Sequence, residues 1–312
     1  MKILFHYDAG STLRKSLEDL DNQGINVVCC PEGPDEPFFT ELRSAKVLWH
    51  VLHPIDATVI ARAPQLKLIQ KIGVGVNTID LEAAQDRGIA VCNMPGTNSR
   101  AVAEMTLLLM LSTLRRLVAI DRSVREGRWS LDQEAKESFG EIAGRTIGIV
   151  GFGEVPGILA PILTAMGARV IYTSRNKKRV PYDHVSMDEL LAESDVVTLH
   201  VPLTTETVHL LDASRIERMK PGAVLINTAR GGLVDEDALY SALTSGGLAG
   251  AGLDVFADEP VNPDNPLLSL EVVTASPHVA WLTNETFARS IEIAVRNSRA
   301  ALGDGEFIHR VV

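Results

Sequence analysis

Short apolar runs alternate along the first third of the chain with segments whose apolar and polar residues recur at helical spacing. The apolar runs predict β-strands at Ile3–Phe5, Val27–Cys29, Lys46–Trp49 and Leu66–Ile72. Segments between them, such as Ser11–Asp21 and Asp56–Ala61, have the amphipathic pattern of surface helices. Strands that alternate with helices in this way predict a parallel sheet covered by helices.

A break in this pattern comes at Asn93–Asn98, where Pro and Gly interrupt the alternation. A long helix is expected to follow, from about Ser99 to Glu126, ending at Gly127. A second series of strands and helices then begins at Thr146. Its expected strands are Thr146–Val150, Arg169–Tyr172, Val196–His200, Ala223–Asn227 and Gly250–Asp254.

The last amphipathic segment, about Asn284 to Leu302, predicts a helix that has no obvious place in the second series. We therefore expect it to pack on the first domain. One domain, 98–284, would then be inserted into a discontinuous domain made of 1–97 and 285–312, with active-site residues in the cleft between them.

Composition narrows the functional classes. The chain has 312 residues, of which 46% are hydrophobic, enough for two cores, and its net charge of −10 disfavours nucleic acid and anionic membranes as partners. Cys29, Cys30 and Cys92 form neither a disulfide framework nor a metal-binding spacing, so we expect no metal and a reducing cytoplasm. The longest apolar stretch, Met105–Leu111, is far shorter than a membrane span.

A glycine-rich turn follows the strand Thr146–Val150 and precedes a helix. Such a turn lets the backbone approach a dinucleotide pyrophosphate, and the helix terminus supplies N–H groups and partial positive charge. The residues expected to contact the cofactor here are Gly151, Phe152, Gly153, Glu154 and Val155. An ordinary tight turn without a ligand is the alternative that this motif alone leaves open.

The turn departs from the usual fingerprint at its third glycine. Pro156 stands there, and Gly157 follows one residue later. Pro is tolerated in the first helical turn, but it removes the close contact between helix and strand that a glycine permits. Pro161 lies further along the same helix and is expected to kink it.

Three later segments concentrate polar residues: Ile226–Gly232, Asp254–Pro260 and Ser276–Thr283. The first two follow expected strands, and the third is a loop that contains Pro277. Ligands of an open parallel sheet bind beyond the carboxyl ends of its strands. The three segments are therefore expected to form one site.

With these segments, the chain resembles the D-2-hydroxyacid dehydrogenase family over nearly its whole length. The similarity also includes Lys71–Asp80, Val102-Ala103-Glu104 and His200–Thr204, in the order typical of the family. It implies a Rossmann dinucleotide-binding domain inserted into a flavodoxin-like parallel α/β domain. It further implies the interconversion of a small 2-oxo acid and its 2-hydroxy acid with NAD or NADP, in a homodimer built on the nucleotide domain and the long helix.

The resemblance implies Arg230, Glu259 and His278 as catalytic residues, with Val74 and Gly75 near the substrate carboxylate. His278 suits a proton donor, because its charge changes near neutral pH, and Glu259 would orient and stabilise the imidazolium. Arg230 would clamp the carboxylate and polarise the carbonyl with its planar fork. Each residue taken singly is more often a solvated or structural group, so the prediction depends on the whole set.

Further contacts are implied more loosely. Trp281, three residues after His278, is a candidate for the substrate pocket, together with Trp49, His50, Leu52 and His53. The resemblance adds further cofactor contacts at Val201, Pro202, Thr207, Thr228, Ala229 and Asp254, the last on the nicotinamide side. These residues do not define the substrate side chain. Small acids such as glyoxylate and hydroxypyruvate are preferred as candidate substrates over larger or aromatic 2-oxo acids.

The form of the cofactor is predicted from the loop after the second strand of the Rossmann series. NAD-binding folds place an Asp or Glu about 20 residues beyond the glycines, to bind the ribose 2′-hydroxyl. Here the segment Thr173–Arg179 contains no acid, and four of its seven residues are basic. Ser174 and Arg175 would bind a 2′-phosphate, so NADPH is expected over NADH. A solvated basic loop is the alternative.

Other functions on the same fold remain open at this point. A nucleotide-sensing regulator, such as the C-terminal-binding co-repressors, shares the architecture and can retain the same three residues, and fold does not decide function. A formate-type dehydrogenase is ranked lower because its substrate loop and length differ. A feedback-regulated phosphoglycerate dehydrogenase is disfavoured because such enzymes usually carry an additional regulatory domain. Turnover of 2-oxo acids with NADPH would discriminate the enzyme from the regulator.

Overall fold

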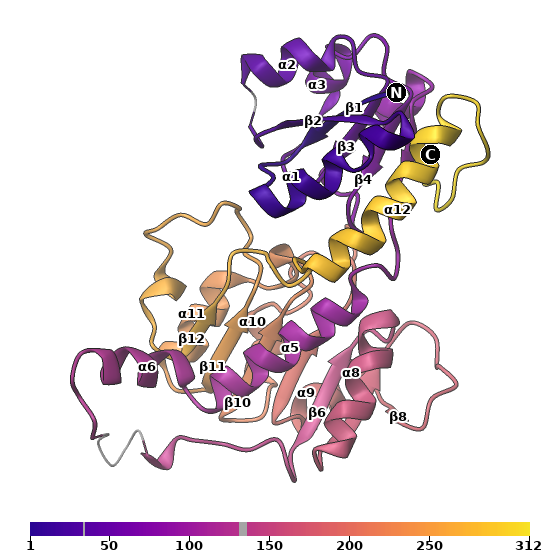
Figure 1. Ribbon diagram of the computed structural model, residues 1–312. Helices are drawn as coiled ribbons and strands as arrows, with labels where there is room; N and C mark the ends of the chain where they lie inside the picture. The colour runs from indigo at the N-terminus through magenta and orange to yellow at the C-terminus, as the bar shows by residue number, and fades with distance from the viewer. Residues whose placement is uncertain (34, 131–135) are drawn as a thin grey trace. The chain divides into compact units, whose positions relative to one another are not determined.

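The computed structural model describes residues 1–33, 35–130 and 136–312. The chain divides into two compact units, the first made of Met1–Asn98 with Thr283–Val312 and the second of Ser99–Leu282 (Figure 1). The first unit is therefore discontinuous in sequence, and the second is a single continuous segment.

Unit 1 contains a parallel sheet in the order β2-β1-β3-β4-β5, which is the flavodoxin-like order. Its strands are β1 Lys2–His6, β2 Asn26–Cys30, β3 Val47–His50, β4 Leu68–Lys71 and β5 Ala90–Cys92. Its helices are α1 Ser11–Glu18, α2 Glu36–Leu42, α3 Ala57–Ala61, α4 Leu81–Asp86 and α12 Asn284–Ala300, with the 3₁₀ turn η1 at Asp21–Gln23.

Local chemistry explains where the short helices of unit 1 begin. Asp56 and Asp80 stand at the N-caps of α3 and α4, and each accepts a hydrogen bond from a backbone N–H of the first turn. The last helix, α12, packs against β4, and its Ser298 accepts a buried hydrogen bond from the indole of Trp49 at 3.0 Å. Trp49 therefore lies in the core of unit 1, so its assignment to a substrate pocket is wrong.

Unit 2 contains a parallel sheet in the order β12-β11-β10-β9-β6-β7-β8, in which the order reverses between β9 and β6. Its strands are β6 Thr146–Val150, β7 Arg169–Thr173, β8 Asp183–His184, β9 Val196–Leu199, β10 Ala223–Asn227, β11 Leu248–Leu253 and β12 Val273–Ala275. Its helices are α5 Ser99–Leu114, α6 Leu117–Arg125, α8 Glu154–Ala165, α9 Met187–Glu193, α10 Ala213–Glu217 and α11 Glu236–Thr244, with 3₁₀ turns η2 Gly231–Leu233 and η3 Pro266–Ser269.

Alternation along the strands of unit 2 builds a core on each face of its sheet. Ile147 and Ile149 point into a core with α5 and α8, which lie on the same face (Figure 1), whereas Val150 points into the other core, with α9, α10 and α11. Strands buried on both faces appear in the sequence as continuous apolar runs, as these do. The predicted fold, a Rossmann sheet with a second flavodoxin-like parallel α/β sheet, is confirmed.

Two sequence predictions about local structure need correction. The helix expected from Ser99 to Glu126 is broken into α5 and α6, because Arg116 adopts a left-handed φ of 49° that no α-helix can accommodate. The strands β5, β8 and β12 were not predicted, since two or three residues are too few to show a pattern.

The helix α8 continues as one element through Pro161, and Thr164, three residues later, donates a side-chain hydrogen bond to the Ala160 carbonyl at 2.9 Å. The expected kink at Pro161 stays a prediction. Among the residues that the structure describes, no helix combines the length and apolar character needed to cross a membrane.

Candidate active site

The glycine turn after β6 has the geometry that a pyrophosphate requires. Gly151 has a φ of 88°, and a Cβ there would lie 2.6 Å from the carbonyl oxygen of His200, so only glycine fits between β6 and β9. Gly153 stands at the N-cap of α8 and is exposed, and a Cβ built on it meets open space. The backbone at Gly153 is thus approachable at a helix N-terminus, which fits a dinucleotide at the point where the strand order reverses.

Pro156 occupies the position of the missing third glycine and is buried in the first turn of α8. It removes one N–H from the helix terminus, so the N–H groups of Gly153, Glu154 and Val155 are those that remain at this end. Phe152 is buried between the turn and the tyrosine ring of Tyr172, with ring centroids 4.7 Å apart.

The segment after β9 lies beside this turn. His200 bonds through Nε2 to the hydroxyl of Thr198 at 3.0 Å, and burial lowers the pKa of His200 to about 3. It therefore stays neutral and is no source of protons at ordinary pH. Val201 and Pro202 follow, and the Thr207 hydroxyl donates to the Pro202 carbonyl at 2.8 Å, which closes this loop upon itself.

Arg230 follows β10 on a turn that Asn227 stabilises. The buried amide of Asn227 donates to the Arg230 carbonyl at 2.8 Å and accepts from the N–H of Ala229 at 3.0 Å. Thr228, also buried, shares a 2.9 Å hydrogen bond with Thr106 of α5. Burial lowers the pKa of the Arg230 guanidinium, and the nearby carboxylate of Glu259 opposes that shift.

The segment after β11 carries Glu259 and packs tightly against the turn after β10. A Cβ on Gly231 would lie 1.9 Å from the carbonyl carbon of Phe256, so backbone meets backbone there. Glu259 accepts from the N–H of Phe256 at 3.0 Å. Burial raises the pKa of Glu259, but the hydrogen bond and charge of His278, the Phe256 N–H and Arg230 outweigh it, so the net shift is downward.

His278 and Glu259 form a hydrogen-bonded pair. Nδ1 of His278 lies 2.6 Å from Oε2 of Glu259, and the two side chains are 17% and 33% exposed. His278 follows β12, so the third polar segment also lies at the carboxyl end of a strand, which the sequence did not predict. The three predicted catalytic residues therefore come from three adjacent strands, β10, β11 and β12.

Asp254 holds the loop that carries His278. One carboxylate oxygen accepts from the hydroxyl of Ser276 at 2.6 Å and the N–H of Val279 at 2.9 Å, and the other accepts from the N–H of Ala280 at 2.9 Å. Burial raises the pKa of Asp254 and these hydrogen bonds oppose the rise. The loop needs this support because His278 has a φ of 54°, in the left-handed region.

Two more residues support this region. Glu236 was not predicted from the sequence, and the predicted role of Trp281 in the substrate pocket stays a prediction. Glu236, on α11, accepts from the N–H of Ala257 at 2.6 Å and the amide of Asn265 at 2.8 Å, and so fixes the segment around Glu259. In the sequence, Glu236 follows the apolar pair Leu233-Val234 by two residues. An acidic residue there indicates only the start of a helix. Trp281 is buried and donates to the His278 carbonyl at 3.0 Å.

In unit 1, Val74 and Gly75 lie in the loop after β4. Gly73, which opens it, has a φ of 150°. Val74 is 42% exposed, and no hydrogen bond is donated by the N–H of Val74, Gly75 or Val76 to any described residue. His50 is fully buried and bonds to the Thr78 hydroxyl at 2.9 Å, so it faces the core side of this loop.

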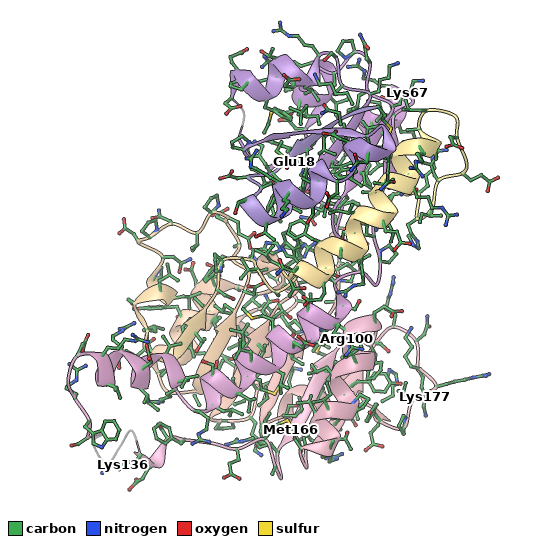
Figure 2. All side chains as sticks on the ribbon, in the orientation of Figure 1. Glu18, Lys67, Arg100, Lys136, Met166 and Lys177 are labelled. Atoms are coloured by element: carbon green, nitrogen blue, oxygen red, sulfur yellow. The ribbon has the colours of Figure 1, made fainter. Side chains whose placement is uncertain are left out.

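The basic loop after β7 projects into solvent. Arg175, Lys177, Lys178 and Arg179 are exposed and form no ion pair with any acid in the described residues, and Figure 2 shows Lys177 extending away from the ribbon. Ser174 donates to the Asn176 carbonyl at 2.7 Å, which tightens the turn. Hydrogen bonds from Thr204 lower the pKa of the Glu206 carboxyl, and the charge of Arg175 adds to that shift.

A Rossmann sheet with an approachable glycine turn, and a histidine–carboxylate pair beside an arginine at its strand ends, defines the class of dinucleotide-dependent oxidoreductases. Residues 107–280 match the family model described as D-isomer specific 2-hydroxyacid dehydrogenase, NAD binding domain. The chain belongs to the D-isomer specific 2-hydroxyacid dehydrogenase family, as its motifs predicted.

Individual relatives agree with this membership. A glyoxylate reductase of Korarchaeum cryptofilum is 42% identical over 78% of this chain and 75% of its own length. A D-3-phosphoglycerate dehydrogenase of Archaeoglobus fulgidus is 44% identical over 74% of this chain, but only 44% of its own length is covered. The solved structure of a glyoxylate reductase from Paecilomyes thermophila has a TM-score of 0.83 at 31% identity, covering 100% of this chain and 98% of that one.

Proposed function

We propose that this protein reduces a small 2-oxo acid to its 2-hydroxy acid with NADPH, and runs the reverse reaction with NADP. The observation that carries the proposal is the 2.6 Å contact between His278 and Glu259, close enough to Arg230 for the guanidinium to lower the Glu259 pKa. Glyoxylate and hydroxypyruvate are the leading substrates, in keeping with the glyoxylate reductases among the relatives.

His278 is the proposed acid and base. Glu259 holds its Nδ1, which leaves Nε2 as the nitrogen that faces a substrate, and no hydrogen bond joins Nε2 to any described residue. A bound nicotinamide would supply the hydride for C2 of the 2-oxo acid. Nε2 of the imidazolium gives its proton to the carbonyl oxygen, and the same nitrogen accepts a proton during oxidation.

Arg230 is the proposed electrophilic group. Its guanidinium carries several donors in one plane, which suits simultaneous contact with a carboxylate and a neighbouring carbonyl oxygen. Negative charge grows on the carbonyl oxygen as the hydride arrives, so a fixed cation there stabilises the transition state more than the ground state. The N–H groups of Val74 and Gly75 are proposed to bind the substrate carboxylate.

The preference for NADPH rests on the exposed cations after β7. Arg175 and its neighbours lack acidic ion-pair partners among the described residues, so a 2′-phosphate gains their charge without displacing a salt bridge. Gly151, Phe152, Gly153, Glu154 and Val155 are proposed to hold the pyrophosphate side, and Val201, Pro202, Thr207, Thr228, Ala229 and Asp254 the remainder of the dinucleotide.

The test is turnover of a panel of 2-oxo acids with each cofactor. We expect kcat/KM with NADPH to exceed that with NADH by at least about tenfold, or roughly 1.4 kcal/mol. Ser174→Asp with Arg175→Ala should erase or reverse the preference, while Lys136→Ala, a basic residue elsewhere in unit 2, should leave it intact. Equal values with NADH would overturn the NADP assignment alone, whereas no turnover of any acid would favour a nucleotide-sensing regulator.

A homodimer is proposed from the surface of α5 and α6. No residue of α6 is buried, although the helix is amphipathic, and large apolar side chains are exposed there and nearby. They are Leu108, Leu117, Val118, Val124 and Trp129. Light scattering should give about twice the 33.8 kDa chain mass, and Leu117→Glu with Val118→Glu should reduce it to that of one chain.

A further inference from the structure

The residues that follow β5 hold the loop that follows β4. These strands are neighbours in the sheet of unit 1. The N–H of Met94 donates to the carbonyl of Gly73 at 2.9 Å, and the side-chain amide of Asn93 donates through Nδ2 to the carbonyl of Val74 at 2.8 Å. Two successive carbonyls of the Gly73–Val76 loop are thus fixed from one side.

The contacts that fix these two carbonyls also fix the N–H groups on the opposite side of the same peptide planes. In a trans peptide the C=O and N–H bonds point in opposite directions within one plane. The carbonyl of Gly73 shares its plane with the N–H of Val74, and the carbonyl of Val74 shares its plane with the N–H of Gly75. With both carbonyls turned toward Asn93 and Met94, both N–H groups point away from them, and neither donates to a described residue.

Two adjacent N–H groups directed to the same side make a concave site for an anion. Gly75 restricts the backbone of the second peptide little, so the orientation of that peptide depends on the contacts it makes. The far end of the loop is tied separately, where the N–H of Ile79 donates to the Val76 carbonyl at 3.0 Å. The Asn93 amide is therefore the contact that sets the orientation of the Val74–Gly75 peptide.

The position of Asn93 is itself well determined. Its backbone N–H donates to the carbonyl of His309 at 3.1 Å. Two residues earlier on β5, Val91 donates to the Val312 carbonyl at 3.2 Å and accepts from the N–H of Val311 at 2.7 Å. The C-terminal segment thus lies against the outer edge of β5 and anchors the residue that reaches the loop. Only the amide can face the Val74 carbonyl favourably, since an aspartate there would place a carboxylate against an acceptor.

We propose that Asn93 is a positioning residue for substrate recognition: it holds the Val74–Gly75 peptide so that the Gly75 N–H stays directed at the substrate carboxylate. This rests on the proposed function of the loop as the carboxylate site. Asn93 acts through the peptide and contacts neither substrate nor cofactor. Its removal should therefore weaken the binding of 2-oxo acids without slowing the chemistry once they are bound.

The experiment compares Asn93→Ala and Asn93→Asp with the parent enzyme and with Asn26→Ala. Asn26 is an exposed residue of β2 in the same unit whose amide makes one long hydrogen bond, at 3.4 Å.

We expect Asn93→Ala to raise KM for glyoxylate about tenfold, the cost of losing one hydrogen bond to a charged group. Asn93→Asp keeps the side-chain volume and should raise KM further, because its carboxylate repels the carbonyl. In both, kcat and KM for NADPH should stay within about twofold of the parent, as should all values for Asn26→Ala.

Inhibition by oxamate, a carboxylate that cannot be reduced, gives an independent measure, and its inhibition constant should rise in parallel with KM. If KM and the oxamate constant stay within twofold in both variants, Asn93 does not position the loop. A fall in kcat, or a change in the KM for NADPH of similar size, would also overturn the proposal, since it would show general damage. Failure of the parent to reduce any 2-oxo acid would instead refute the proposed function.

Discussion

The two units share one architecture but present different chemistry at their strand ends. In unit 1 the loop after β4 offers backbone N–H groups, and the side chain between them, Val74, is apolar and exposed. In unit 2 the segments after β10, β11 and β12 offer Arg230, Glu259 and His278, and hydrogen bonds within each turn or loop support all three. If the proposed roles are right, recognition by the main chain of unit 1 should tolerate side-chain changes, whereas catalysis by the side chains of unit 2 should not.

The largest effect is expected from His278→Ala. It removes the proposed proton donor, so kcat for 2-oxo acid reduction should fall by at least about 100-fold, the low end of general acid catalysis. The matched control is His209→Asn, because His209 is an exposed histidine of unit 2 with a φ of 47°, which Asn tolerates. Steady-state kinetics with the best substrate provides the measurement. A near-parental kcat in His278→Ala would remove the residue from the mechanism.

The next effect concerns the close approach of two turns in unit 2. Gly231→Ala places a methyl group 1.9 Å from the Phe256 carbonyl carbon, so the backbone must move. We expect the free energy of unfolding to fall by roughly 3 kcal/mol, with Glu259 displaced and kcat reduced. Gly232→Ala is the control, since its Cβ meets only the end of the Leu203 side chain, at 3.2 Å. If thermal unfolding showed the same loss of stability in Gly231→Ala and Gly232→Ala, the close packing of Gly231 against Phe256 would not be the cause.

Glu259→Gln should alter the pH dependence of reduction. The carboxylate favours the protonated form of His278, and because the pKa of Glu259 is held below its usual value, that charge is present throughout the neutral range. Its loss removes the charge that faces Nδ1 of the proposed proton donor at 2.6 Å. The limb on which kcat/KM falls with rising pH should then move down by about one pH unit, equivalent to about 1.4 kcal/mol. A limb that stays in place, or moves to higher pH, would show that the pair is not coupled to the reaction.

The smallest effect is expected in unit 1. Val74→Ala leaves both peptide groups of the proposed carboxylate site unchanged, so kcat/KM for glyoxylate should change by less than about threefold, or roughly 0.7 kcal/mol. Asn93→Ala, which leaves the Val74 side chain but frees its carbonyl, should cost more. If Val74→Ala were the more damaging of the two, recognition in this loop would depend on the side chain after all.

The sequence predicted most of the sheet and the family, for different reasons, whereas the roles of the site residues stay predictions. The long strands were evident because burial on both faces produces apolar runs such as Thr146–Val150, and the family was evident because three motifs occur in its order. The break at Arg116, where φ is 49°, carried no signal, since neither Pro nor Gly marks it. Asn93 also carried none, because an Asn beside Met94-Pro95-Gly96 looks like any turn residue, and its partner lies 19 residues away.

The placement of α12 has a consequence for biosynthesis. The continuous segment Ser99–Leu282 carries every strand and helix of unit 2, so that unit can fold as soon as it leaves the ribosome. Unit 1 differs, because its first 98 residues are synthesised before unit 2, whereas α12 and the segment that covers β5 are synthesised after it. Until then the indole of Trp49 lacks its partner Ser298 and one edge of the sheet is uncovered. The first 98 residues therefore wait through the synthesis of unit 2 with part of their sheet uncovered, a state that favours aggregation.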